Sequence, residues 1–184
     1  FNVMFSQRGV LTLAHSRHDL DAQSRWANAM LCNGVDAELL DASQVRALEP
    51  RLNFGADARH PILGGFVQRR AGSARHDAVA WGYARAASAL GVDIVQNCAV
   101  TGFVKQAGRI VGVTTSRGEI RADKVGLAVA GHSSVLAAMA GFRLPVTSYA
   151  LQAMVSEPVK PVLQTVTLSP SLGAYWSQSD KGEV

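Results

Sequence analysis

Cysteine, charged residues and long apolar runs are all scarce in this chain of 184 residues. Its two cysteines, Cys32 and Cys98, stand far apart with no cysteine or histidine at ligand spacing beside them, which argues against a disulfide scaffold and a structural zinc site. No apolar run approaches the roughly 20 residues that cross a membrane. No basic stretch precedes an apolar one as in a secretory signal. These absences predict a protein of the reducing cytoplasm with no membrane partner.

Charged residues make up only 17% of the chain and hydrophobic residues 48%, so the sequence predicts a folded core and not disorder. Lysine and arginine total 18 against 14 for aspartate and glutamate, a net charge of +4. The one tight basic cluster is formed by Arg69, Arg70 and Arg75, which is too small for a nucleic-acid surface and lacks interleaved aromatics. A few cations beside an anionic cofactor explain it at least as well, and no nucleic-acid partner is expected.

The motifs of common hydrolases, metalloenzymes and nucleotide-binding loops are missing. There is no G-x-S-x-G, no H-E-x-x-H and no serine, histidine and aspartate in triad order. His15 and His18 lack a third ligand, so no metal site is predicted, and no catalytic residue is identified. Neither G-x-G-x-x-G nor a P-loop occurs, so if a dinucleotide binds, the turn that cradles its phosphates lies outside these residues. The ends, Phe1 and a strand-like stretch with no terminal helix, predict an internal piece of a longer protein.

Alternating helical and strand-like periods predict an α/β fold with α+β character. Helices are expected where apolar residues recur at helical spacing between a capping residue and a breaker, at residues 17–33, 42–48, 78–90 and 133–139. Strands are expected at 62–68, 93–97, 100–104, 110–116, 119–122, 125–130, 146–155, 162–168 and 174–177, with one or two before residue 14. The clearest of these elements is the helix 78–90, which Asp77 caps and Gly91 ends.

One histidine, His76, stands directly before the predicted cap of this helix. The positive end of the helix dipole disfavours an imidazolium there and keeps a neutral, nucleophilic ring available. The same helix start, with Arg75 and the nearby arginines at 69 and 70, suits a phosphate. The alternative is an ordinary residue before a helix, with arginines that face water, and spacing alone does not exclude it.

A second candidate region for ligand binding is rich in small residues. A predicted strand opens at Val100, a glycine-containing hairpin follows, and the strand 125–130 ends at Ala130 and Gly131. A strand that ends in small residues lets backbone approach a flat ligand without a steric penalty. Tight packing between strands explains the pattern equally well.

Several runs resemble the D-amino-acid-oxidase-like family of FAD-dependent amine oxidoreductases. They are LGVDIVQNCAVTGF at 90–103, GRIVGV at 108–113, ADKVGLAVAGHSSVLAAMAG at 122–141, LP at 144–145 and LQAMVSEP at 151–158. The resemblance covers residues 62–184 and, more loosely, the first 60. It implies a D-amino-acid-oxidase-type fold without the family's amino-terminal dinucleotide fold and its carboxy-terminal FAD-binding strand and helix.

The resemblance also implies a division of the chain. Residues 1–61 would belong to the FAD domain and its connecting helices, and residues 62–145 to the strands and helix that contact the flavins. Residues 146–184 would begin the sheet of the substrate domain.

Within this family, the run 69–103 and the later AGHSSVLAAMAGFRLP and SQSDKGE resemble the β-subunit class of heterotetrameric sarcosine oxidases. That class carries noncovalent FAD, and FMN joined through its 8α-methyl carbon to a histidine. The Arg-His-Asp pattern places this linkage on His76, with Arg75 against the FMN. The same correspondence makes Val100, Ala130 and Gly131 neighbours of FAD, and brings Gln152 and Ala153 to the FMN.

The resemblance implies an oxidase that demethylates sarcosine to glycine and formaldehyde. FAD accepts the hydride, FMN receives the electrons, and oxygen becomes hydrogen peroxide. Partners would be the α, γ and δ subunits of such an enzyme. Two alternatives stay open at this point: a glycine or amine oxidase of the same family with a single FAD and an idle His76, and a noncatalytic binding module or inactive partial gene product.

Overall fold

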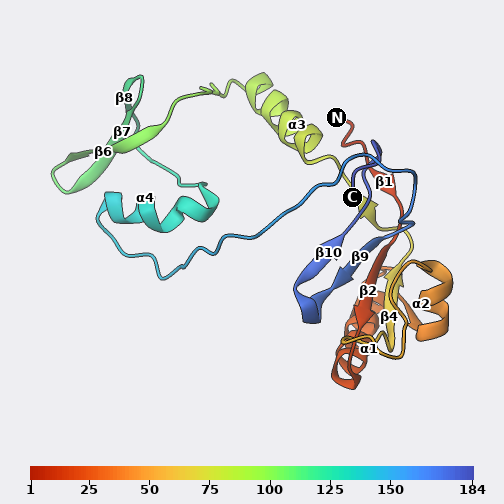
Figure 1. Ribbon diagram of the computed structural model, residues 1–184. Coiled ribbons are helices and arrows are strands. Elements are labelled where there is room, and N and C mark those ends of the chain that lie inside the picture. The colour runs from red at the N-terminus through yellow and green to blue at the C-terminus, as the bar shows by residue number, and fades with distance from the viewer. The chain divides into compact units, whose positions relative to one another are not determined.

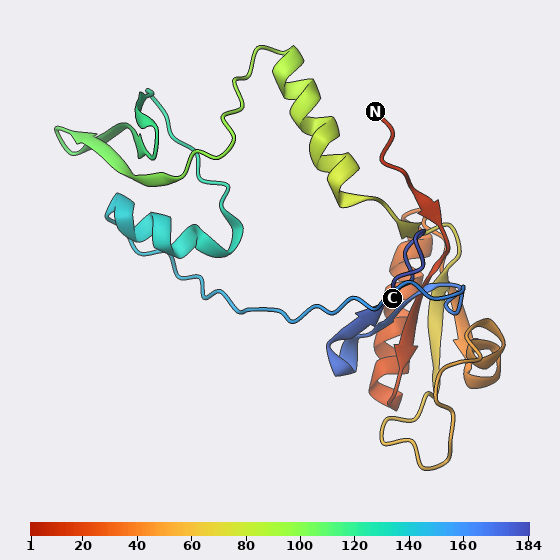
Figure 2. The same ribbon diagram turned by 45° about the horizontal axis from the view of Figure 1, so that its top comes forward.

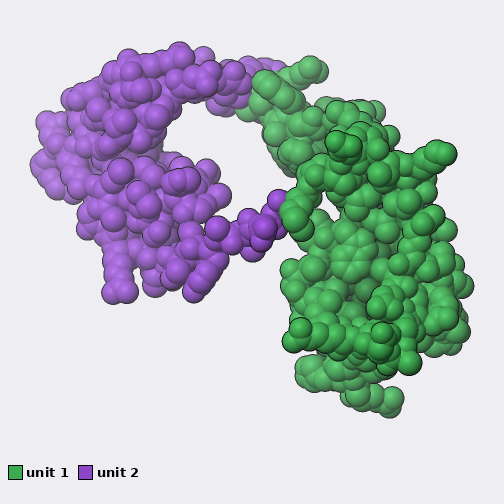
Figure 3. Space-filling view, viewed as in Figure 1, with its two compact units in different colours: residues 1–87, 154–184 green, residues 88–153 purple.

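The computed structural model describes all residues, Phe1–Val184, and the chain divides into two compact units (Figure 3). Unit 1 comprises Phe1–Ala87 and Met154–Val184, and unit 2 comprises Ser88–Ala153. The expected division at residues 61 and 145 concerns contacts with flavins and stays a prediction. None of the helices is both long and apolar enough to span a membrane.

Unit 1 contains a five-stranded sheet with the order β10-β9-β2-β4-β3 (Figure 1). Its strands are β2 (Val10–Ala14), β3 (Glu38–Asp41), β4 (Gly64–Gln68), β9 (Val166–Ser169) and β10 (Ala174–Trp176). Only β2 and β9 run parallel, and the other neighbours are antiparallel. The last segment of the chain therefore extends the sheet that the first segment begins.

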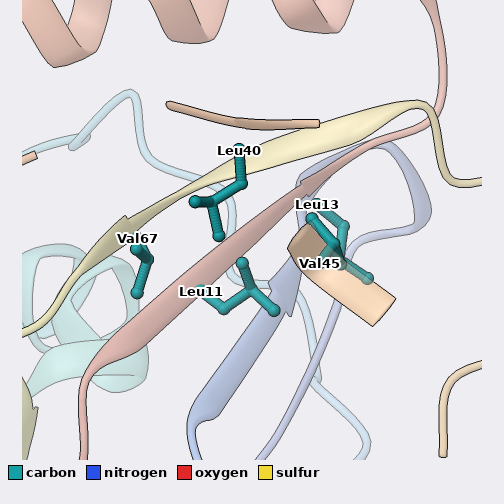
Figure 4. Packing of buried hydrophobic residues seen from close by; sticks show 5 residues of the cluster. All are labelled: Leu11, Leu13, Leu40, Val45 and Val67. Carbon is teal, nitrogen blue, oxygen red and sulfur yellow. The ribbon is translucent and has the colours of Figure 1, made fainter. Parts of the chain in front are cut away.

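Two helices pack on opposite faces of this sheet. They are α1 (Arg17–Cys32) and α2 (Ala42–Leu48), and each starts with a capping box, at Ser16 and at Asp41 respectively. Side chains alternate between the faces of a strand. Leu11, Leu13, Leu40 and Val67 accordingly meet Val45 of α2 in a buried cluster (Figure 4), whereas Phe66, the neighbour of Val67, contacts Trp26 of α1 at a centroid distance of 5.6 Å. Figure 2 shows both helices beside the sheet from a second direction.

Neighbouring backbone comes close to the two glycines of β4, Gly64 and Gly65. Gly65 pairs with Leu13 of β2, and a Cβ atom at Gly65 would collide with the carbonyl oxygen of Thr12. Because the carbonyl belongs to a central strand, it cannot move aside without breaking the ladder. Glycine at this position therefore allows β2 and β4 to pair.

A buried carboxylate joins the two sequence segments of unit 1. Glu49, which follows α2, is 1% exposed and accepts hydrogen bonds from the backbone N–H groups of Gln164 and Thr165 and from the Thr165 hydroxyl. These donors directly precede β9. The carboxylate thus fixes the point where the returning chain enters the sheet.

Outside the five-stranded sheet, unit 1 contains a short pair of strands and a long helix. The pair is β1 (Ser6–Gln7) with β5 (Gly72–Ser73), and the helix is α3 (His76–Ala89), whose last two residues belong to unit 2. The 3₁₀ turn η2 (Pro170–Leu172) joins β9 to β10. Unit 2 is an antiparallel meander of β6 (Val100–Gln106), β7 (Arg109–Thr115) and β8 (Gly118–Arg121), followed by η1 (Ala130–His132) and α4 (Ser133–Ala140).

Several predicted elements are wrong. Residues 93–97, 125–130 and 146–155 form no strand, because an extended segment becomes a strand only when a neighbouring backbone completes its hydrogen bonds. The strand predicted at 162–168 is confined to β9, and the short strands β3 and β5 were not predicted. The helix predicted to begin after Asp77 begins instead at His76, since the carbonyl of Arg75 accepts the first helical hydrogen bond, from Val79, at 3.1 Å.

Candidate functional site

A pocket of about 670 Å³ in unit 1 contains the best candidate site. Its walls come from three segments, residues 2–8, 73–77 and 177–183. The first two are joined by the β1–β5 pair and by a 3.0 Å hydrogen bond from the Arg75 N–H to the carbonyl of Val3. The third returns beside β1 at the end of the chain (Figure 1), where Arg8 donates to the carbonyl of Gln178 at 2.8 Å.

His76 lines this pocket as the first residue of α3. Its side chain is exposed, and no group of the chain hydrogen-bonds to either ring nitrogen. The ring lies on the first helical turn and not before the cap as predicted, but it remains at the positive end of the helix. An accessible imidazole with two free nitrogens can form a bond to a ligand in the pocket.

Arg75 is held by two carboxylates. Its Nε lies 3.5 Å from Asp77 Oδ1 and its Nη1 lies 3.4 Å from Asp180 Oδ2, and its side chain is one-third exposed. A hydrogen bond from the N–H of Ala78, together with the neighbouring charge of Arg75, holds the pKa of Asp77 below its ordinary value. The Asp77 carboxylate is therefore ionised at neutral pH, and the two acidic side chains beside Arg75 offset its charge.

The third wall is organised by the buried side chain of Gln178, which is 6% exposed. Its amide makes five hydrogen bonds: the nitrogen donates to the carbonyls of Val159, Lys160 and Gly182, and the oxygen accepts from the N–H groups of Val162 and Leu163. Every donor and acceptor of the amide is used, so the segment has one defined path. The sequence analysis did not predict this wall. The Gln178 side chain bonds to backbone groups of loops, and no local sequence pattern indicates such contacts.

The other predicted site residues lie in unit 2. Val100 opens β6, and Ala130 and Gly131 belong to η1, where Ala130 has a φ of 45° and its carbonyl accepts from Ser133 at 2.7 Å. Gln152 and Ala153 are exposed and lie outside helices and strands. The structure thus brings Arg75 and His76 into one pocket, and the roles of the five residues of unit 2 stay predictions.

Comparison with known proteins identifies the group to which the chain is related. The sequence model of the FAD dependent oxidoreductase family matches residues 1–184. The chain belongs to the FAD dependent oxidoreductase family. This confirms the predicted fold class and the expected FAD-dependent class of protein.

Curated relatives of this family member include sarcosine oxidase subunit beta of Rhizobium meliloti, with 56% identity over 182 residues, and that of Rhodobacter capsulatus, with 52% identity over 184 residues. The alignments cover 99% and 100% of this chain but only 44% of each relative. The chain therefore spans less than half the length of these relatives. Their names confirm the resemblance seen in the sequence.

A solved structure of L-proline dehydrogenase from P. horikoshii matches this family member with a TM-score of 0.76 and 22% identity. The match covers 97% of this chain and 48% of that one. At this identity the likeness supports the fold alone.

The residues of the pocket can be tested against the flavins that this family member is expected to bind. FAD needs a glycine-rich turn at a helix start for its two phosphates, and no such turn occurs within residues 1–184. The residues of the pocket therefore do not provide the cradle for the two phosphates of FAD. Three cationic side chains, those of Arg8, Arg75 and Lys181, line the pocket together with three carboxylates and the accessible ring of His76; the carboxylates belong to Asp77, Asp180 and Glu183.

Proposed function

We propose that this chain is part of the β subunit of a heterotetrameric sarcosine oxidase and carries the covalent FMN of that enzyme. The main support is the identity of 52–56% to two proteins named sarcosine oxidase subunit beta, which extends over nearly every residue. Identity at this level along a whole segment is much higher than a shared fold requires. The pocket at His76 provides independent chemical support.

The proposed reaction converts sarcosine, water and oxygen to glycine, formaldehyde and hydrogen peroxide. Bound FAD would supply the acceptor for a hydride from the N-methyl carbon of sarcosine, which would convert the substrate to an imine. Water adds to the imine and releases formaldehyde and glycine. Bound FMN would supply the route for the two electrons to dioxygen, which would also take up two protons. The flavins supply this two-electron chemistry, and the protein positions and shields them.

His76 is the proposed attachment residue. Its exposed ring, at the positive end of α3, has no hydrogen-bond partner that would compete for its nitrogens. Attachment replaces one C–H bond of the 8α-methyl group and the N–H bond of the imidazole by a single C–N bond. The two hydrogens leave as two protons and two electrons, which the flavin ring passes to dioxygen to give hydrogen peroxide.

Other residues are assigned by the same correspondence. Arg75 would lie against the FMN, and Gln152 and Ala153 would approach it. Val100, with Ala130 and Gly131, would contact the noncovalent FAD. The complete enzyme would also contain α, γ and δ subunits, with the FMN at the boundary to the α subunit, and would work in the cytoplasm.

The test uses the complete β subunit expressed together with its partner subunits. Sarcosine-dependent formation of peroxide, with flavin that stays on the β polypeptide after acid precipitation, is the expected result. Absence of such peroxide from fully flavin-loaded enzyme would overturn the oxidase assignment. Peroxide formation with complete release of flavin by acid would favour an amine oxidase that uses FAD alone.

A further inference from the structure

The positive charges that line the pocket beside His76 are unequally compensated. Arg75 lies between two carboxylates, those of Asp77 and Asp180. An anion that approached Arg75 would therefore meet a group of three side chains with a net negative charge. Arg75 is better placed to tie the start of α3 to the third wall than to bind an anion.

Arg8 lines the same pocket in a different electrostatic setting. It is half-buried, and its hydrogen bonds go to neutral acceptors: Nη1 donates to the carbonyl of Gln178 at 2.8 Å and Nε to the hydroxyl of Ser6 at 3.3 Å. It forms no ion pair with a carboxylate. Neutral acceptors orient a guanidinium without cancelling its charge, and the N–H groups of Nη2 remain free to donate.

The third cation, Lys181, is exposed and is held only through its backbone N–H, which donates to Ser179 Oγ at 3.2 Å. Its ammonium adds positive charge to the pocket but has no contact that fixes its direction. Glu183, the remaining acid of this wall, accepts a hydrogen bond from the same Ser179 hydroxyl. Arg8 is therefore the one cation of the pocket that is both oriented and uncompensated.

We propose that Arg8 binds an oxyanion in this pocket, and that this oxyanion is the phosphate of the flavin attached to His76. Only the identity of the ligand rests on the proposed function. The uncompensated charge and the two orienting hydrogen bonds of Arg8 do not depend on it. A carboxylate of the substrate shares the chemistry of the phosphate and is the competing source, which the experiment separates.

The first experiment needs no flavin in the pocket. The complete enzyme with His76→Ala cannot attach FMN, so inorganic phosphate can be titrated against its melting temperature at constant ionic strength, with chloride as reference. Phosphate should raise the melting temperature. In the same background Arg8→Met should remove this rise, and Arg8→Lys should keep part of it and show that the fold tolerates change at this position.

The second experiment measures attachment to enzyme that has an intact His76 but was produced without FMN. Loss of a charge-assisted contact by Arg8→Met should raise the FMN concentration for half-maximal attachment on the order of tenfold, whereas attachment of riboflavin, which lacks the phosphate, should not change. Arg17→Met removes an exposed arginine of α1, 87% exposed at its side chain, and serves as the matched control with no expected effect.

The outcomes separate the two proposals. Equal losses with FMN and riboflavin, or no loss with either, would overturn the role of Arg8 in binding phosphate. An unchanged FMN requirement with a raised KM for sarcosine and weaker inhibition by acetate would assign the Arg8 oxyanion to the substrate carboxylate and overturn the phosphate assignment. Wild-type enzyme without any covalent flavin would overturn the proposed function, while the phosphate titration would still test Arg8.

Discussion

The guanidinium of Arg75 lies 3.4 Å from the carboxylate of Asp180, a residue 105 positions later in the chain. This ion pair joins the start of α3 to the wall formed by residues 177–183. The wall returns to the pocket because β9 adds to β2 in parallel and β10 adds to β9. The candidate site therefore depends on both sequence segments of unit 1.

Replacement of the proposed attachment residue gives the most direct prediction. His76→Ala in the complete enzyme should abolish flavin that survives acid precipitation and leave the noncovalent FAD in place, because only the imidazole can form the C–N bond. In-gel fluorescence of the denatured β subunit measures the covalent flavin. His18→Ala, at an exposed position of α1, is the control. Covalent flavin that persisted in His76→Ala would refute the assignment.

The buried amide of Gln178 should support both stability and attachment. Gln178→Leu removes the side-chain hydrogen bonds to five backbone groups, of which only the Gly182 carbonyl has another partner, and should lower the free energy of unfolding of the full-length subunit by about 2–3 kcal/mol. Covalent flavin should fall as the third wall loosens. Urea unfolding measures the first effect, and Gln164→Leu, at a nearby exposed side chain, is the matched control. Equal stability of the two variants would show that Gln178 does not organise the wall.

The close packing of β2 against β4 predicts that a substitution at Gly65 strongly lowers the stability of the protein. Gly65→Ala forces a methyl group against the carbonyl of Thr12 and should destabilise the full-length subunit by about 2–3 kcal/mol. Gly126→Ala, where a Cβ atom meets nothing within 4 Å, should change stability by less than about 0.5 kcal/mol. Both values come from the midpoint of urea unfolding. Similar values for the two variants would argue against the close approach.

Two ion pairs at the edge of the sheet predict a dependence of stability on pH. Asp36 pairs with Arg70 at 3.0 Å, and Glu38 of β3 pairs with Arg69 at 2.6 Å. The hydrogen bond from the Arg70 N–H lowers the pKa of Asp36, and the hydrogen bond from the Arg69 side chain lowers the pKa of Glu38. A pKa lower in the folded state means that the stabilisation is present above the unfolded value of about 4 and is lost as pH falls through the folded value.

The double variant Asp36→Asn and Glu38→Gln should therefore be less stable than wild type near neutral pH, and the difference should shrink below about pH 4. Urea unfolding of the full-length subunit at a series of pH values measures it. A difference that grew as the pH fell would contradict the direction of both pKa shifts.

The elements that the sequence predicted correctly are those with local causes. The capping residues Ser16 and Asp41 start α1 and α2 as expected, and α4 ends at Gly141 with a φ of 99°. The hairpins of unit 2 follow the glycines at their turns. Each of these signals acts within about four residues, so no knowledge of distant partners is needed.

The predicted strands that do not form in the structure have a different explanation. Residues 93–97 and 125–130 have apolar sequences typical of strands, but no backbone in this chain pairs with them. The short strand β3 was missed for the opposite reason, because the ladder to β4 and not its sequence makes it a strand.

The family and the helix starts could be predicted from the amino-acid sequence, because a motif and a capped helix are local features of the chain. The roles of Arg75 and His76 come from the same local motif and stay predictions. Only the tertiary structure showed that Arg8, Gln178 and Asp180 join them around one pocket. It also showed that Arg8 has no carboxylate beside it whereas Arg75 has two, because the charge of a cation is offset by carboxylates within a few ångströms in space. Distance along the chain contains no information about such neighbours.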